Sequence, residues 1–148
     1  MHIWQSLLPQ AIAWAKAQSQ TAELAGKPLD EAESIIANRV GVIHPERVRV
    51  CLVSEIPAPT DQELQVLANQ LGLLGGKTVG ITLGYTILIS TRSFSHRVLS
   101  HELRHVSQFE KAGSISEFLT EYIRQIVQFG YKNAPLELDA RSHEFEIY

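Results

Sequence analysis

The 148-residue chain carries a net charge of −3, and 45% of its residues are apolar, which is typical of one globular domain. Its basic residues form no run, and no apolar segment is as long as a membrane span, so we expect neither nucleic acid nor a membrane as a partner. The single cysteine, Cys51, allows no internal disulfide and is expected to be a buried strand thiol. Because the first residues also lack the order of a signal peptide, we expect a cytoplasmic protein.

Two helices are predicted within residues 1–45. Apolar residues at helical spacing predict the first over residues 6–24, and Gly26 ends it. Pro28 can open the second helix. Apolar stripes of this kind favour packing on the core over a separate lid or accessory role. We therefore predict a single domain over residues 1–148.

Three strands and one helix are predicted in the middle of the chain. The strands are expected at residues 48–54, 78–83 and 85–90. A capping box from Thr60 to Glu63 predicts a helix between the first two strands, and Gly72 ends it. Gly84 predicts a tight turn or a bulge between the last two strands.

Three further helices are predicted in the C-terminal part. The first ends at Gly113, and a second capping box opens the next at Ser114. That helix ends at Gly130, and the last one begins at Pro135 and extends to about Ile147. Together the elements predict an α+β fold with a small, mostly antiparallel sheet packed with several helices.

The sequence His101-Glu102-Leu103-Arg104-His105, an H-E-x-x-H motif, lies on the helix that ends at Gly113. Positions i and i+4 share a helix face, so both imidazoles can reach one metal ion, and Glu102 can take a proton from a water beside it. On a helical wheel these three polar groups lie on or beside the apolar arc, opposite a polar arc that includes Gln108. Buried polar groups cost roughly a few kcal/mol each without partners. A shared metal ion would satisfy all three, and we favour it over two hydrogen-bonded core histidines.

A catalytic zinc site usually has a third protein ligand. Glu117 and Glu121 share a polar arc and are expected to be solvated. Glu137 and Asp139 flank the buried stripe of the last predicted helix on opposite sides, and Glu144 follows them. Each of these three is a candidate ligand, and Asp139 or Glu144 could instead orient a ligand histidine.

Three segments carry a family resemblance: Ile81-Thr82-Leu83-Gly84-Tyr85-Thr86-Ile87, His101-Glu102-Leu103-Arg104-His105-Val106-Ser107-Gln108 and Asn133-Ala134-Pro135-Leu136-Glu137-Leu138-Asp139-Ala140. In this order they resemble bacterial zinc metallopeptidase domains of the gluzincin-like class, over less than half of the chain. The resemblance implies a zincin-like active-site helix preceded by a strand. It also implies that a later helix supplies a carboxylate, which maps the third ligand onto Glu137.

The motif and the resemblance predict a zinc-dependent metallopeptidase that hydrolyses a peptide or protein substrate. His101, His105 and Glu137 would hold Zn²⁺, and Glu102 would act as the general base. A donor to the oxyanion is also needed, and the candidates are Tyr131, His96 and Arg97. The alternative is a non-catalytic, metal-stabilised module that binds a partner protein.

Overall fold

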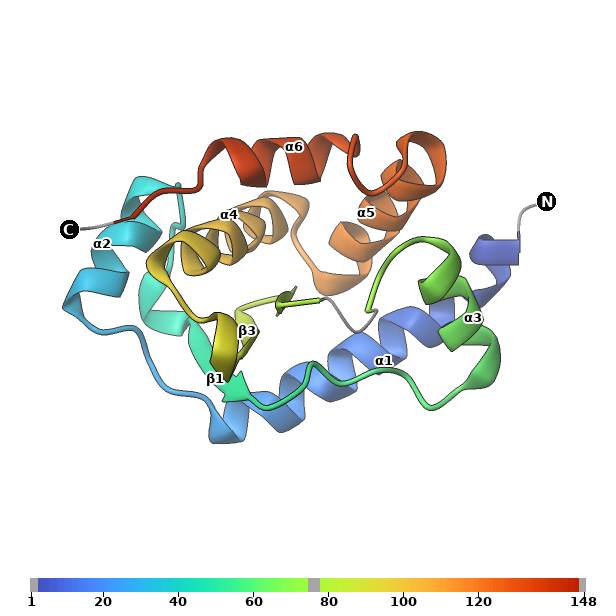
Figure 1. Ribbon diagram of the computed structural model, residues 1–148, viewed down its shortest axis with the longest axis horizontal. Helices are drawn as coiled ribbons and strands as arrows, with labels where there is room; N and C mark the ends of the chain where they lie inside the picture. The colour runs from blue at the N-terminus through green and yellow to red at the C-terminus, as the bar shows by residue number, and fades with distance from the viewer. Residues whose placement is uncertain (1–2, 75–77, 147–148) are drawn as a thin grey trace.

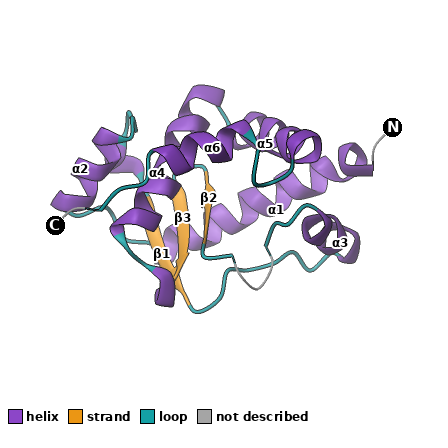
Figure 2. Ribbon diagram, turned by 45° about the horizontal axis from the view of Figure 1, so that its top comes forward, coloured by secondary structure: helices purple, strands orange, loops and turns teal. Residues whose placement is uncertain are grey.

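A three-stranded sheet lies at the centre of the fold, and helices cover both of its faces (Figures 1 and 2). The computed structural model describes residues 3–74 and 78–146. Its strands are β1 (Arg49–Val53), β2 (Gly80–Leu83) and β3 (Thr86–Ser90), in the spatial order β1-β3-β2. The predicted α+β class is confirmed.

The sheet is mixed. β2 and β3 form the predicted antiparallel hairpin, whose turn contains Gly84 with a φ of 70°. β1 pairs with β3 in parallel. The sheet is therefore mixed rather than mostly antiparallel as predicted, because one of its two ladders is parallel. Parallel neighbours need a long crossover, and the chain between β1 and β3, which includes α3 (Gln62–Gln70) and β2, supplies one.

Side chains of β3 alternate between two apolar clusters on opposite faces of the sheet. Ile87 and Ile89 are buried against α2 (Glu31–Arg39) and α4 (His96–Ala112), and Leu99 and Leu103 of α4 belong to the same cluster. Leu88 belongs to the other cluster, with residues of α1 (Ile3–Ala25). The helix that carries the motif is therefore held on the sheet by its apolar arc.

Several helix ends follow local sequence signals. Gly113 ends α4 with a left-handed φ of 100°, and Ser114 caps α5 (Ile115–Phe129), both as predicted. Asp30 and Glu33 form a capping box at the start of α2, so the prediction that Pro28 opens this helix is wrong. A reciprocal pair of hydrogen bonds at the helix start outweighs the local preference of a proline.

Two predicted boundaries differ from the observed ones. Asp61, rather than Thr60, caps α3. The last helix, α6 (Pro135–Ser142), ends at Ser142 instead of extending to about Ile147, which lies outside the described residues. The segment after α6 turns onto α4, where the backbone N–H of Phe145 donates to the Ser100 hydroxyl at 3.1 Å. This turn brings the residues after α6 next to the motif.

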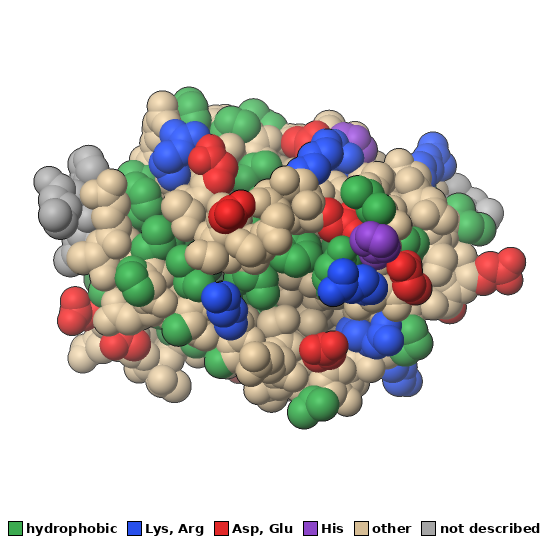
Figure 3. Space-filling view, turned by 180° about the vertical axis from the view of Figure 1, so that it is seen from behind, with side chains coloured by type: hydrophobic (Ala, Val, Ile, Leu, Met, Phe, Trp, Pro, Cys, Tyr) green, Lys and Arg blue, Asp and Glu red, His purple; other side chains and the backbone are tan. Residues whose placement is uncertain are grey.

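Within the described residues, no helix combines the length and the apolar character that crossing a membrane requires. On the face shown in Figure 3, acidic and basic side chains are interspersed with apolar ones. Cys51 lies on β1 and packs, partly buried, in the cluster on the α1 side of the sheet.

Candidate metal centre

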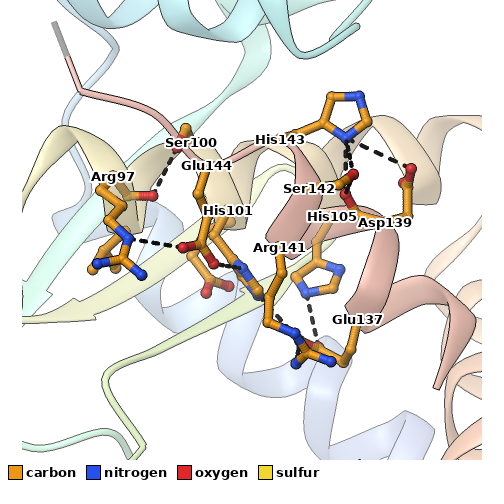
Figure 4. A network of polar contacts seen from close by, with 12 residues as sticks. Arg97, Ser100, His101, His105, Glu137, Asp139, Arg141, Ser142, His143 and Glu144 are labelled. Atoms are coloured by element: carbon orange, nitrogen blue, oxygen red, sulfur yellow. Dashed lines mark hydrogen bonds and ion pairs between the residues drawn. The ribbon is translucent and has the colours of Figure 1, made fainter. Parts of the chain in front are cut away.

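α4 and α6 bring the three predicted metal ligands together (Figure 4). Nε2 of His101 lies 3.1 Å from Glu137 Oε1, and Nε2 of His105 lies 2.9 Å from Glu137 Oε2. One ligand atom from each residue falls within 4.8 Å of the others. His105 and Glu137 are buried, whereas His101 is partly exposed. Two nitrogens and one carboxylate thus converge on a common point.

The other ring nitrogen of each histidine is hydrogen-bonded. Nδ1 of His101 lies 2.7 Å from Glu144 Oε2, and Nδ1 of His105 lies 2.7 Å from Gln108 Oε1. The Gln108 amide donates to the Leu136 carbonyl at 2.9 Å and to Asp139 at 2.8 Å, so its oxygen must face His105. Nδ1 of His105 is therefore the donor, so Nε2 is the nitrogen that the neutral ring would offer to a metal ion.

Asp139 and Glu144, the other two candidate ligands, have supporting positions. Asp139 receives hydrogen bonds from the Arg104 guanidinium at 2.8 and 3.3 Å, in addition to the bond from Gln108. Glu144 contacts His101 directly, so it can orient this histidine, as the sequence analysis considered. Of the three candidates, only Glu137 belongs to the group that could hold a metal ion within the described residues.

Gln108 is a site residue that the sequence reasoning missed. The helical wheel placed it on the polar arc of α4, yet it is only 7% exposed. α6 packs against α4 at this position, where the Gln108 amide donates to the Leu136 carbonyl, and Ser100 and Ser107 of the same arc are buried as well. The usable signal was its spacing, because a residue three positions after His105 lies on the same helix face.

Glu102 lies between α4 and the edge strand β2. The residue is 6% exposed, and the Thr82 hydroxyl lies 2.9 Å from its Oε1 and 3.0 Å from its carbonyl oxygen. A Cβ atom added at Gly80 would lie 3.2 Å from the carboxylate carbon of Glu102. The absence of a side chain at Gly80 therefore leaves the space that this carboxylate occupies.

The charges of the centre stabilise one another. Burial by itself raises the pKa of Glu137, but hydrogen bonds from His101 and His105 hold that pKa far below its usual range. Burial lowers the pKa of His101, and the carboxylates of Glu137, Glu102 and Glu144 more than reverse this, raising it to about 9. The pKa of His105 is likewise raised, because Glu137 and Glu102 outweigh the effect of its burial. The buried carboxylate therefore favours the protonated form of both imidazoles.

Tyr122 is a second residue whose place the sequence reasoning missed. It lies on the apolar arc of α5, opposite Glu117 and Glu121, and its hydroxyl donates to Glu137 Oε2 at 2.6 Å. Burial, followed by the charge of Glu137, raises the pKa of this phenol well above its usual value. The phenol thus stays protonated and fixes the carboxylate from the side of α5.

A cavity of about 710 Å³ opens at the centre and includes Tyr131 and Arg141 in its wall. Tyr131, the predicted oxyanion donor, is 41% exposed, and burial together with the charge of Glu137 raises its pKa. Arg141 lies one helical turn after Glu137, with Nη1 at 3.9 Å from Glu137 Oε1. Arg97 also lines the cavity, and its Nε donates to Glu144 at 2.9 Å. His96 is not among the residues of the wall.

The chain matches no family model, and no curated protein or solved structure is significantly similar to it. The resemblance to gluzincin-like metallopeptidases therefore stays a prediction.

Proposed function

We propose that the protein is a zinc-dependent hydrolase that cleaves peptide bonds, with a zincin-like arrangement of its motif helix. The observation that carries the proposal is the convergence of His101 Nε2, His105 Nε2 and the Glu137 carboxylate on one point. A set of two imidazoles and one carboxylate, with room for a substrate beside it, is typical of catalytic zinc.

The partners of these three residues fit a metal site. Ligand histidines almost always donate their second ring N–H to an oxygen acceptor. Here the acceptors are the Glu144 carboxylate for His101 and the Gln108 amide oxygen for His105. Glu137 is 1% exposed and accepts from Tyr122, so its carboxylate has a fixed orientation. A zinc ion bound there would supply Lewis acidity, which lowers the pKa of a water and polarises the substrate carbonyl.

The side chains around the centre have distinct parts in this proposal. Glu102, held by Thr82, takes a proton from the attacking water and passes it to the leaving amine. Tyr131 is protonated at neutral pH, and burial raises its pKa further, so it can donate to the developing oxyanion. Arg141 presents a second donor to the same cavity.

Replacing Glu102 by Gln separates catalysis from metal binding. The variant keeps the three ligands, so we expect normal zinc content and a loss of peptide hydrolysis of about 100-fold or more. Glu23→Gln, on an exposed position of α1, is the matched control and should keep full activity. Undiminished hydrolysis by the Glu102→Gln variant would rule out the proposed general base.

A metal-stabilised binding module is the second candidate. The observation that favours it is the dense network that joins α4 to α6 through Arg104, Asp139 and Gln108. A metal ion held by the same two helices would add to that connection and stabilise the fold. Bound zinc without turnover of a broad peptide mixture would support this module over the hydrolase.

A further inference from the structure

The cavity beside the candidate metal centre has two chemically different ends. Lining residues from α1 and α3 are all apolar, and they are Ala11, Trp14, Ala15, Leu64, Leu67 and Ala68. The charged lining residues lie around the centre instead, on α4, α6 and the segment that follows α6. An occupant would therefore place a polar group at the ligands and apolar groups toward α1 and α3.

The volume indicates how large that apolar group is. A cavity of about 150 Å³ lined by apolar side chains holds one benzene molecule. The cavity here, at about 710 Å³, is several times larger and lies within the usual range for ligand pockets. It has room for more than one bulky apolar side chain.

The edge strand β2 indicates that the occupant is a peptide. Ile81, Thr82 and Leu83 of this strand line the cavity, and β2 pairs with β3 along one edge. Among the described residues, no strand pairs with its other edge. An unpaired edge can add an extended peptide through main-chain hydrogen bonds, with alternate side chains entering a pocket.

We propose that the cavity selects peptides in which large apolar residues, aromatic or leucine, flank the bond to be cleaved. The selection rests on the proposed hydrolase, because it describes the substrate of the same centre. The apolar end receives the side chains, and the scissile amide lies at the polar end beside Glu102 and Glu137.

The selection is tested with zinc-loaded protein and a series of fluorogenic peptides that carry Gly, Ala, Leu or Phe on each side of one bond. We expect kcat/KM to rise by about 10-fold or more from Gly to Leu or Phe. Equal cleavage of the Gly and Phe peptides would overturn the proposal.

Two substitutions on α3 provide a matched pair. Ala68→Phe adds a ring to the cavity wall and should remove most of the preference for Phe, whereas Val66→Phe, on the exposed side of the same helix, should leave it unchanged. Ala68→Leu is the milder variant if the aromatic ring prevents folding. An unchanged Phe-to-Gly ratio in a folded Ala68 variant would also overturn the proposal.

A binding measurement tests this inference separately from the proposed catalysis. Fluorescence anisotropy with the Glu102→Gln variant should show about 10-fold tighter binding of the Phe peptide than of the Gly peptide. The wild type could cleave no peptide while this difference in affinity persists and Ala68→Phe removes it. In that case the proposed hydrolase activity is wrong, and the selection of apolar side chains is supported. If dodecanoyl-glycine displaces the Phe peptide and binds more tightly, the assignment to a peptide is wrong.

Discussion

Removing the charge of Glu137 should change how the stability of the metal-free protein depends on pH. Burial lowers the pKa of His101, and Glu137 is the principal group that reverses this and raises it from 6.5 to about 9. A group with a raised folded-state pKa contributes stability that is complete below the unfolded pKa. That contribution is lost as the pH rises through the folded pKa. The window for His101 therefore runs from about pH 6.5 to about pH 9.

The size of the effect follows from the difference between the two pKa values. The folded-state pKa of His101, about 9, exceeds the unfolded value of 6.5 by about 2.5. For a side chain that is 14% exposed, this difference corresponds to about 3 kcal/mol of unfolding free energy. Titration of His101 should remove up to this amount from the metal-free wild type between pH 6.5 and pH 9.5, and His105, whose pKa is also raised, should add to the loss. Glu137→Gln keeps the size of the side chain but not its charge, so the variant should lose less than half as much.

Urea denaturation of chelator-treated protein at a series of pH values measures both losses. Glu121→Gln is the control, because Glu121 pairs with Arg124 on the surface of α5, away from the centre. This control should keep the wild-type pH dependence. The same loss of stability in wild type and Glu137→Gln would refute the assignment of Glu137 as the group that holds His101 protonated.

Three further predictions concern the metal. Gln108→Leu removes the partner of His105 Nδ1 and should weaken zinc binding roughly 10- to 100-fold in competition with a chromophoric chelator, so unchanged affinity would contradict the orienting role. Gly80→Val places a side chain against the Glu102 carboxylate and should abolish peptide hydrolysis while zinc content is kept, and an active variant would show that the carboxylate has room to move. Chelation of the zinc-loaded protein should lower its melting temperature, because metal binding stabilises the folded state, and an unchanged melting temperature would argue against a metal site.

Local signals were sufficient for the helices that frame the motif. Gly113 and Ser114 mark the end of α4 and the start of α5, and both acted as predicted because a cap depends on residues within one helical turn. The spacing of His101 and His105 likewise sets their common face within α4. At the start of α2, two local signals competed, and the Asp30 capping box prevailed over Pro28.

The third member of the metal group could not be decided from local signals. Glu137, Asp139 and Glu144 lie within one short segment, and each was compatible with the chemistry. The rotation of α6 against α4 directs Glu137 toward the histidines and Asp139 toward Arg104. The early end of α6 frees the following residues to turn back, which places Glu144 beside His101.

The sequence by itself determined the motif helix, the common face of its histidines and the position of Glu102 beside them, since these depend on residues within two turns. Only the tertiary structure decided the parallel ladder, the burial of Gln108, the contact of Tyr122 with Glu137 and the cavity between α1, α3, β2 and α5. Each of these features is a contact between elements that are distant in the chain. Their relative orientation is set by how all the apolar faces pack together, and no short stretch of sequence contains that information.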